Sequence, residues 1–407
     1  MKKVIIIGAG AQATVISGVL SKSSVVDQIV VTDIDEDRAR ELAEVNGSPK
    51  VTAEKIDASS IDQMAKRMKE GKFDLVVNAT IPQFVRQVLQ AAFAARTNYL
   101  DMASGELYPK PDIPIEQMEY AKEWEEAGLR CLTGAGGDPG LSNIMAKDAV
   151  LELDTVDKIM IKDYGIIESE KPVALWSMRT YLEDSSDHST MWIDGKPVKM
   201  APFSGEEQYY FPPPLDTNGT VYYHAHEESV TIPLFCGKKV NYCDFKLGEP
   251  AIDLWKFLIL GLGLMDTAPE EFNGCRVSPR EMMFKKIPPT PSPKEQIRLY
   301  ESGELESKLM LTCDVEGTKN GKPVHYKLFT DSPDGSTACK WIKGTSDVSW
   351  MTSIPASIFS LMLLQDQVDH IGVFPPEVFT RKELEVFYKG IKEWGITVTK
   401  RVESPVQ

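Results

Sequence analysis

The chain has 407 residues, about the length of two domains at roughly 100 to 200 residues each. Its 42% hydrophobic and 26% charged residues are typical of a soluble globular protein and exclude a disordered chain, a collagen-like repeat or a coiled coil. The formal net charge of −15 repels phosphate backbones and anionic lipid surfaces, and no basic patch reverses that sign locally. We therefore expect no nucleic-acid partner and no membrane partner.

The sequence also bears on the compartment. Its longest apolar stretch, residues 254–265, contains Lys256 and is shorter than the roughly 20 residues that a membrane-spanning helix needs. The apolar run after Met1 leads into glycines rather than into a small-residue cleavage site. The six cysteines are scattered without a Cys-x-x-Cys pair, which favours reduced thiols over a disulfide framework. We expect a cytoplasmic protein.

The first 145 residues alternate short apolar runs with helical patterns. The predicted strands lie at 4–7, 29–32, 75–78, 99–101 and 129–133, and the predicted helices at 38–45, 61–68 and 85–95. Repeated strand–helix–strand units form parallel sheets with helices on both faces. Residues 1–145 are therefore predicted to form a doubly wound Rossmann domain of the α/β class.

Beyond Gly140 the pattern changes to that of an antiparallel sheet. Alternating polar and apolar residues predict strands at 158–162, 229–233, 308–315 and 324–330. Tight-turn dipeptides such as Asn320-Gly321 separate segments of this kind. Residues 146–349 are predicted to be an inserted α+β substrate and dimerisation domain on an open mixed or antiparallel sheet. In the tail, a Ser/Pro start at Ser353 predicts an apolar helix at 358–364, followed by a helix at 381–394 and a strand at 396–400.

A glycine motif follows the first predicted strand and opens the first helix, which is the context of a dinucleotide-binding fingerprint. Gly8 permits a tight turn, Gly10 lets the backbone approach a pyrophosphate, and Ala13 allows close packing of helix on strand. The helix start at Ala11 and Gln12 offers free N–H groups to the phosphates. The alternative is a glycine turn without a ligand.

The end of the second strand bears on the choice of cofactor. Asp33 lies where an acidic side chain accepts hydrogen bonds from the adenosine ribose, and the neighbouring Ile34 supplies no cation for a 2′-phosphate. NAD is therefore predicted in preference to NADP. Two alternatives stay open: Arg38 and Arg40 could compensate the charge, or Asp33 could simply cap the next helix. Later loops on the same sheet edge supply the other predicted cofactor contacts: Asp57, Ala58, Ala79, Thr80 and Pro82.

Several motifs resemble the saccharopine dehydrogenase family. The loop at 134–143 has that family's G-x-D-P-G-x-x-N pattern, and Trp176-Ser177, residues 226–233 and residues 371–377 also match it. Residues 273–280 are similar to the lysine 6-dehydrogenase branch. The chain departs from the pattern at Met178-Arg179, where many relatives follow Trp-Ser with Pro-Glu.

The resemblance implies an activity and a domain arrangement. Hydride would be transferred between NAD(P) and a carbon bonded to nitrogen, in saccharopine, lysine or a carboxylated polyamine, through an imine. The family's fold further implies that residues 350–407 complete the Rossmann domain around the inserted substrate domain.

Hydride transfer at such a carbon needs a group that manages the amine proton. Asp138, inside the Gly/Pro-rich loop, is the predicted catalytic carboxylate, and Asp101 is a second. The alternative for Asp138 is a turn-stabilising residue at a helix start. Glu106 is a further carboxylate predicted to bind the substrate.

The remaining substrate-binding predictions lie in the second domain: Tyr164, Trp176, Ser177, Arg179, His226 and Glu228. The Arg179 guanidinium would pair with a substrate carboxylate, with Arg276 and Arg280 as alternatives. Tyr164 could instead be a core aromatic. No metal is predicted, because His224 and His226 lack a third ligand at a suitable spacing.

The glycine motif predicts an NAD(P)-binding protein, and the resemblance implies an oxidoreductase that acts on the C–N bond of an amino acid or amino-acid conjugate. We expect a small-molecule, amino-acid-type substrate and a homodimer formed through the face or edge of the open sheet. The alternative is a non-catalytic dinucleotide-binding sensor or regulatory protein of the same fold.

Overall fold

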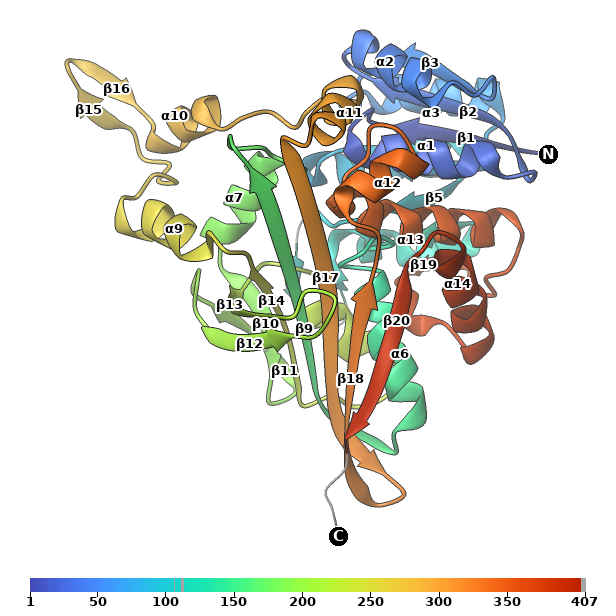
Figure 1. Cartoon of the computed structure of the whole chain (residues 1–407). Helices are drawn as coiled ribbons and strands as arrows, with labels where there is room; N and C mark the ends of the chain where they lie inside the picture. Colours follow the sequence, from blue (N-terminus) through green and yellow to red (C-terminus); the bar gives the residue numbers. More distant parts are fainter. Residues whose placement is uncertain (106, 111–112, 404–407) are drawn as a thin grey trace.

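The computed structural model describes residues 1–105, 107–110 and 113–403. Two large sheets stand side by side, one carrying the N-terminus and the other built of longer strands that lead to the C-terminus (Figure 1). Two small hairpins also occur: β6 (Leu107–Lys110) with β7 (Ile113–Ile115), and β15 (Glu270–Phe272) with β16 (Cys275–Val277).

The first large sheet is parallel throughout and has the strand order β19-β8-β5-β4-β1-β2-β3. Its strands are β1 (Lys2–Ile7), β2 (Val26–Asp33), β3 (Val51–Lys55), β4 (Leu75–Asn78), β5 (Asn98–Asp101), β8 (Arg130–Leu132) and β19 (Gly372–Phe374). Every residue from Val4 to Ile7 is buried, as expected for a parallel strand covered on both faces.

Helices cover both faces of this sheet. Val4 and Ile6 belong to the core that includes α1 and α13, whereas Ile5 and Ile7 belong to the core that includes α3 and α4. The helices of this part are α1 (Ala11–Lys22), α2 (Glu36–Asn46), α3 (Ile61–Gly71), α4 (Val85–Ala95), α5 (Ala121–Glu126), α13 (Asp347–Leu364) and α14 (Arg381–Glu393). The predicted doubly wound Rossmann sheet is thus confirmed.

The second large sheet is mixed and follows the order β11-β10-β14-β9-β17-β18-β20, with β12 and β13 attached beside β14. Only β14 and β9 pair in parallel within it. Its strands are β9 (Thr155–Ser169), β10 (Ser189–Ile193), β11 (Lys196–Met200), β12 (Glu207–Phe211), β13 (Thr217–Tyr223), β14 (Tyr242–Gly248), β17 (Leu305–Lys319), β18 (Lys322–Asp331) and β20 (Thr397–Glu403).

One continuous hydrophobic core joins the two sheets, because residues of both belong to it together with α6 (Leu141–Glu152) and α13. α6 packs against β9 and β17, and α13 packs against α1 and β17. Among the described residues α13 alone is long and apolar enough to cross a membrane by length and composition, but 83% of that stretch is buried inside the protein. Such burial is typical of a core helix.

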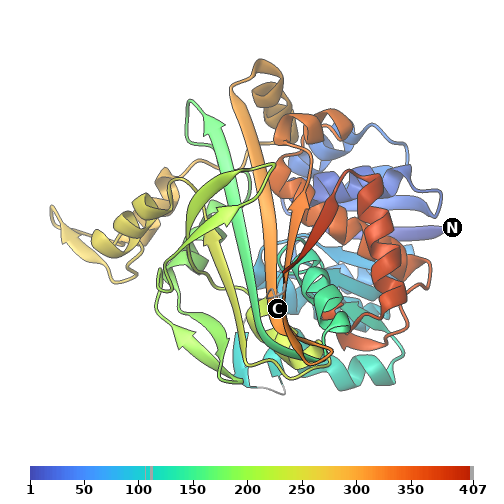
Figure 2. The same cartoon turned by 60° about the horizontal axis from the view of Figure 1, so that its bottom comes forward.

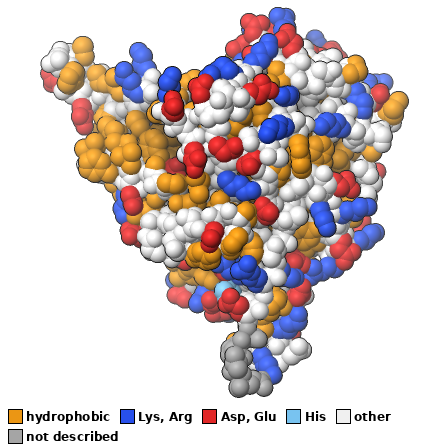
Figure 3. All heavy atoms as spheres, viewed as in Figure 1, with side chains coloured by type: hydrophobic (Ala, Val, Ile, Leu, Met, Phe, Trp, Pro, Cys, Tyr) orange, Lys and Arg blue, Asp and Glu red, His pale blue; other side chains and the backbone are white. Residues whose placement is uncertain are grey.

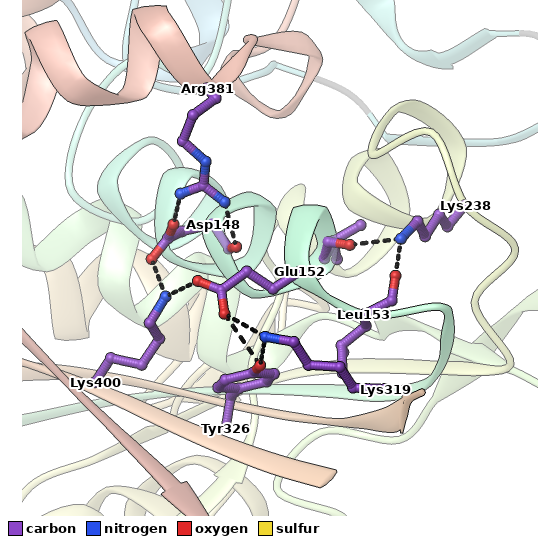
Figure 4. A network of polar contacts seen from close by, with 9 residues as sticks. Asp148, Glu152, Leu153, Lys238, Lys319, Tyr326, Arg381 and Lys400 are labelled. Atoms are coloured by element: carbon purple, nitrogen blue, oxygen red, sulfur yellow. Dashed lines mark hydrogen bonds and ion pairs between the residues drawn. The ribbon is translucent and has the colours of Figure 1, made fainter. Parts of the chain in front are cut away.

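A network of charges holds the C-terminal elements to the far end of α6 (Figure 4). Asp148 pairs with Arg381 of α14 and with Lys400 of β20, and Lys400 also pairs with Glu152. Lys319 of β17 binds the other oxygen of Glu152 at 3.1 Å. Because these ions are partly buried and mutually hydrogen-bonded, the network fixes α14 and β20 on α6.

The remaining helices surround the long strands. They are α7 (Met178–Ser186), α8 (Glu228–Phe235), α9 (Ile252–Lys256), α10 (Pro279–Lys286), α11 (Pro293–Ser302) and α12 (Gly335–Trp341), with a π-helical turn at Phe257–Gly261. The segment from α9 through α10 projects away from the body in both views (Figures 1 and 2).

Three predictions of local structure are corrected. Residues 229–233 are not a strand but part of α8, because Val230 to Ile232 are buried on all sides and tertiary packing overrides their strand preference. α13 begins at Asp347, where Ser346 caps it, and runs through Pro355 rather than starting after Ser353. The closing strand, β20, pairs with β18 in the mixed sheet, whereas β19 joins the parallel sheet. The predicted domain boundaries stay a prediction.

Candidate functional site

A cavity of about 1390 Å³ opens where the two sheets meet. One wall consists of the loops that follow β1, β4 and β5, which are the carboxyl ends of adjacent parallel strands. Such a sheet edge is where doubly wound folds bind ligands. The opposite wall comes from β9, α7, the segment before α8 and the end of β14.

The glycine motif forms the floor of the first wall. Gly8 has φ +100°, and a Cβ there would lie 2.6 Å from the Ala79 carbonyl oxygen, so only glycine fits this close approach of two loops. At Gly10 an added Cβ would meet nothing within 4 Å, which leaves open space beside the N-terminus of α1. Ala11 and Gln12 line the same space. This arrangement fits a dinucleotide pyrophosphate.

The other predicted cofactor residues divide into two groups. Ala79, Thr80 and Pro82 line the cavity together with Gly10, Ala11 and Gln12. Ala13 is fully buried between helix and sheet, as its role in close packing requires. Ile34, Asp57 and Ala58 do not line the cavity, and Asp57 accepts hydrogen bonds from Ser59 in a turn before α3.

Asp33 sits behind the glycine loop. Its carboxylate accepts hydrogen bonds from the backbone N–H groups of Ala9 at 2.9 Å and Asp35 at 3.0 Å. Asp35, not Asp33, caps α2, so the alternative role of Asp33 as a helix cap is wrong. Arg38 and Glu41 of α2 both line the cavity, and Arg40 instead pairs with Glu36 and Asp37 on the surface.

Three of the sequence motifs meet at the buried N-terminus of α6. The Asn143 side chain accepts a hydrogen bond from the Gly140 N–H at 2.8 Å and donates one to Glu377 at 2.8 Å. Ser142 donates to Glu228 at 3.5 Å. The positive end of the helix dipole favours carboxylates at this position. These contacts explain why the 134–143, 226–233 and 371–377 motifs occur together.

Asp138 lines the cavity at the start of this helix, beside His226 and Glu228. Ligand atoms of the three side chains all lie within 4.8 Å of one another, and His226 Nδ1 is 3.4 Å from Glu228 Oε2. The His226 ring stacks on Phe245 with centroids 4.0 Å apart. Glu228 is fully buried behind His226 and does not line the cavity. We call these three residues the Asp–His–Glu cluster.

The charges of the cluster shift the pKa values of Asp138 and His226. Burial raises the pKa of Asp138 to about 7, against the lowering effect of His226 and with a further raising effect of Glu228. Burial lowers the pKa of His226, but the Glu228, Asp138 and Glu227 carboxylates outweigh it and raise that pKa to about 10. His226 is therefore a cation at neutral pH, next to a carboxyl group that can gain or lose a proton.

The cluster also corrects one argument made from the sequence. Asp138 joins His226 and Glu228 as a third potential metal ligand, which the spacing in the sequence did not reveal because Asp138 lies far from them in the chain. The absence of a metal stays a prediction, since the geometry alone admits a cation. His224 is buried against Tyr181, and its Nε2 atom has no hydrogen-bond partner among the described residues.

Asp101 lines the cavity but is held by its surroundings. One carboxylate oxygen accepts from the Gly134 N–H and the other from the Gln117 side chain, each at 2.9 Å. Burial raises the pKa of Asp101 to about 6. Because both oxygens are already bonded, Asp101 is suited to positioning the loop that carries Asp138.

The other predicted substrate residues are placed as follows. Trp176 and Ser177 line the cavity, and Ser177 caps α7. Arg179 does not line the cavity and pairs with Glu183, as does Arg280. Tyr164 also lies outside it, packed on Phe211 in a small core cluster. Glu106 lies outside the described residues.

Several carboxylates that line the cavity were not predicted from the sequence. Asp163 on β9, Asp184 on α7, Glu227 before α8 and Glu249 after β14 all line the cavity. Burial raises the pKa of Asp184 to about 7 and that of Glu227 to about 8. Glu227 stands beside two residues that the motif match did select, but no spacing links the other carboxylates in the sequence.

Family models match nearly the whole chain. The saccharopine dehydrogenase NADP-binding domain matches residues 4–132, and the saccharopine dehydrogenase C-terminal domain matches residues 136–396. The carboxyaminopropylagmatine dehydrogenase of Synechocystis is 23% identical over 100% of this chain and 99% of its own. The carboxynorspermidine synthase of Vibrio alginolyticus is 24% identical over 82% of this chain and 79% of its own.

Solved structures agree on the fold. Apo saccharopine dehydrogenase (L-Glu forming) from Saccharomyces cerevisiae has a TM-score of 0.73 at 14% identity, covering 99% of this chain and 100% of that one. Homospermidine synthase from Legionella pneumophila, in complex with NAD, has a TM-score of 0.67 at 11% identity, covering 99% and 91%. The expected enzyme class, an NAD(P)-dependent oxidoreductase, is confirmed. The chain belongs to the saccharopine dehydrogenase family.

Proposed function

We propose that this enzyme oxidises or reduces the C–N bond of an amino-acid conjugate that carries several positive charges, of the carboxylated polyamine type. The observation that carries the proposal is the charge of the cavity. Its described lining includes ten carboxylates but only three Lys or Arg side chains, Arg38, Lys171 and Lys199. A cavity of this sign attracts polycations and repels anionic substrates.

The carboxylates are also poorly compensated by the protein itself. No hydrogen bond or ion pair joins the Asp184 side chain to a described residue, and Asp163 Oδ1 is buried without a hydrogen-bond partner, so that the charge of His226 is the main compensation for both. Burying like charges without a counter-ion is unfavourable. Ammonium groups spaced along a substrate would relieve that cost at several points. The names of the two sequence relatives, which include carboxylated agmatine and norspermidine derivatives, support the same substrate class.

Asp138 is the proposed acid–base group. A bound nicotinamide would take the hydride from the substrate carbon, or return it. In the oxidative direction the Asp138 carboxylate accepts a proton from the substrate ammonium, and the freed lone pair forms the C=N bond as hydride leaves. In the reductive direction Asp138 returns that proton. Its pKa of about 7 suits both directions near neutral pH.

We propose that His226 and Glu228 act through Asp138 rather than through a metal. A protonated imidazole has no free lone pair for a cation, and the raised pKa of His226 keeps it protonated. The positive charge of His226 holds Asp138 in place and limits the rise of the Asp138 pKa. The Glu228 carboxylate pairs with Nδ1 of the His226 ring and fixes its position. Lys171 and Lys199, rather than Arg179, stand where they can meet a substrate carboxylate.

NAD is the proposed cofactor in preference to NADP, although the matching family model is described as NADP-binding. The negative charge of Asp33 lies directly behind Ala9, and Glu41 offsets Arg38 in the lining of the cavity. We further propose a cytoplasmic enzyme with residues 1–145 and 350–407 binding the cofactor and residues 146–349 binding the substrate.

The function is tested by following NADH and NADPH in both directions with lysine, saccharopine, other basic amino acids and carboxylated polyamines. We expect the highest kcat/KM with a carboxylated polyamine, because its extra ammonium groups meet the cavity carboxylates. Preference for saccharopine would contradict the substrate class. Tight cofactor binding without turnover of any substrate would instead support the non-catalytic sensor.

Asp138→Asn should lower kcat by about 10²-fold or more, because the amide cannot accept the substrate proton. Binding of NAD should stay within about twofold, since the phosphates lie at the glycine loop. Asp62→Asn, an exposed residue of α3, is the matched control. If Asp138→Asn lowers the melting temperature but leaves kcat intact, the residue only stabilises the turn.

NAD should bind more tightly than NADP, by roughly tenfold or more, which corresponds to about 1.4 kcal/mol. Asp33→Asn should narrow this difference, because it removes the charge that repels a 2′-phosphate yet keeps an acceptor for the Ala9 N–H. Titration calorimetry of both cofactors with both proteins measures the effect. Equal or tighter binding of NADP to the unaltered enzyme would refute the preference.

The free enzyme should lose stability as pH rises from about 4 to 7. Asp184 has a folded-state pKa near 7, above the ordinary value of 3.8, so its contribution is complete below about pH 4 and is lost as pH rises through 7. Asp184→Asn should flatten the slope of unfolding free energy between pH 5 and 7 by up to roughly 1.4 kcal/mol per pH unit. Urea unfolding at several pH values measures this slope. An unchanged slope would mean that ionisation of Asp184 costs the folded protein no stability.

A further inference from the structure

A proline-rich strap, residues 287–293, runs from the end of α10 to the first residue of α11. Its sequence is Ile-Pro-Pro-Thr-Pro-Ser-Pro, and each of the seven residues lines the cavity. The strap has no regular secondary structure before Pro293, which opens α11. Because proline fixes the backbone at four of the seven positions, the strap is extended and semi-rigid. It is therefore a stiff border of the cavity rather than a flexible loop.

The first end of the strap is fixed to the substrate wall of the cavity. Ile287 packs against the core cluster that contains Tyr181 and Leu182 of α7. The Thr290 hydroxyl donates a hydrogen bond to the Trp176 carbonyl oxygen at 2.7 Å, just before α7 begins. This end of the strap therefore moves with the wall that carries Trp176.

The second end reaches the opposite wall at α2. The Lys294 N–H donates to Glu41 Oε1 at 3.1 Å, and the Lys294 ammonium pairs with Glu44 Oε2 at 2.9 Å. Pro293 approaches Gly344 so closely that an added Cβ on that glycine would lie 2.7 Å from the Pro293 Cβ. The chain between α10 and α11 crosses to the body and brings α11 beside α2 (Figure 1).

The space-filling view shows acidic and basic side chains side by side along the upper rim of the molecule, over α2 and α11 (Figure 3). The strap thus spans the cavity from α7 to α2.

The α2 side is the adenosine end of the cavity. α2 follows β2, and the end of β2 carries Asp33 at the position expected to meet the adenosine ribose. The phosphates are expected at Gly10, and the nicotinamide at the loops after β4 and β5. Arg38 and Glu41, one turn apart on α2, both line the cavity. Glu41 is also the acceptor of the Lys294 N–H, so the strap meets the cofactor wall at this end.

The contact between the strap and α2 is suited to opening and closing. The Lys294 and Glu44 side chains are 58% and 67% exposed, and exposed ion pairs hold weakly. A dinucleotide can therefore enter or leave by breaking this contact. A proline-rich segment has little conformational entropy to lose when the contact forms again.

We propose that the strap is part of the cofactor site: together with α2 it encloses the adenosine half of the bound dinucleotide. Lys294 does not line the cavity, so it is a positioning residue that acts through the strap and Glu41. The adenosine half leaves only after the Lys294 contact opens. The proposal rests on the binding of a nicotinamide dinucleotide and not on the substrate class of the enzyme.

The test is the rate at which NADH dissociates, measured by stopped-flow fluorescence without any substrate. Lys294→Glu places a carboxylate against Glu41 and Glu44, so dissociation should become at least about threefold faster. ADP-ribose, which has the adenosine half but no nicotinamide, should bind more weakly by a similar factor in titration calorimetry. Adding Glu44→Lys to this variant reverses the ion pair and should restore both values. NADPH replaces NADH if it binds more tightly.

Lys285→Glu is the matched control, because Lys285 is exposed on α10, does not line the cavity and undergoes the same change of charge. It should leave both values unchanged. An unaltered dissociation rate in Lys294→Glu overturns the proposal, and so does an equal acceleration in Lys285→Glu, which would make net charge the cause. If neither NADH nor NADPH binds to the unaltered enzyme, the cofactor assignment itself fails, a result distinct from a bound cofactor whose release ignores Lys294.

Discussion

The site depends on one buried helix. All residues of α6 from Leu141 to Val150 are buried, and the helix packs against the long strands of the mixed sheet while sharing a core with the parallel sheet. Its N-terminus is fixed by Asn143, which joins the Gly140 turn to Glu377. Its C-terminal end is tied to α14 and β20 by Asp148 and Glu152. The position of Asp138 is therefore set by contacts at both ends of one rigid element.

That anchorage allows the enzyme to keep uncompensated negative charge in its cavity. The dipole of α6 offsets part of the cost for Glu228 and Glu377, and His226 offsets part of the cost for Asp138. Among the described residues the charge of His226 compensates Asp163 and Asp184 only in part, because burial still raises the pKa of both. We infer that the substrate supplies the remaining positive charge, so that binding energy from remote ammonium groups orients the reacting carbon.

The sequence predicted the parallel sheet well because its strands are continuous apolar runs and its loops carry glycines whose backbone geometry is specific. Gly8 illustrates this, since only glycine permits its contact with Ala79. His226 of the motif at 226–233 lines the cavity, but the motif was predicted with the wrong secondary structure, because β-branched residues favour strands until packing decides otherwise.

Most of the acidic residues that line the cavity could not be predicted from the sequence. Asp163 and Asp184 come from a strand and a helix that meet only in the folded chain, and neither occurs in a recognisable motif. Arg179 was predicted to bind a substrate carboxylate, because a guanidinium suits that group. In the structure it pairs with Glu183 on the surface of α7 instead. Local chemistry suggests a role, whereas tertiary contacts determine which residues face the substrate.

The most direct measurement is a crystal structure of the enzyme with NAD and a non-oxidisable carboxylated polyamine analogue. We expect the amine nitrogen at the reacting carbon within hydrogen-bond distance, about 2.6 to 3.2 Å, of an Asp138 oxygen. The distal ammonium groups should lie beside Asp163 and Asp184. A complex in which that nitrogen contacts neither Asp138 nor a water bound to it, with Asp138 bonded only within its own turn, would contradict the account.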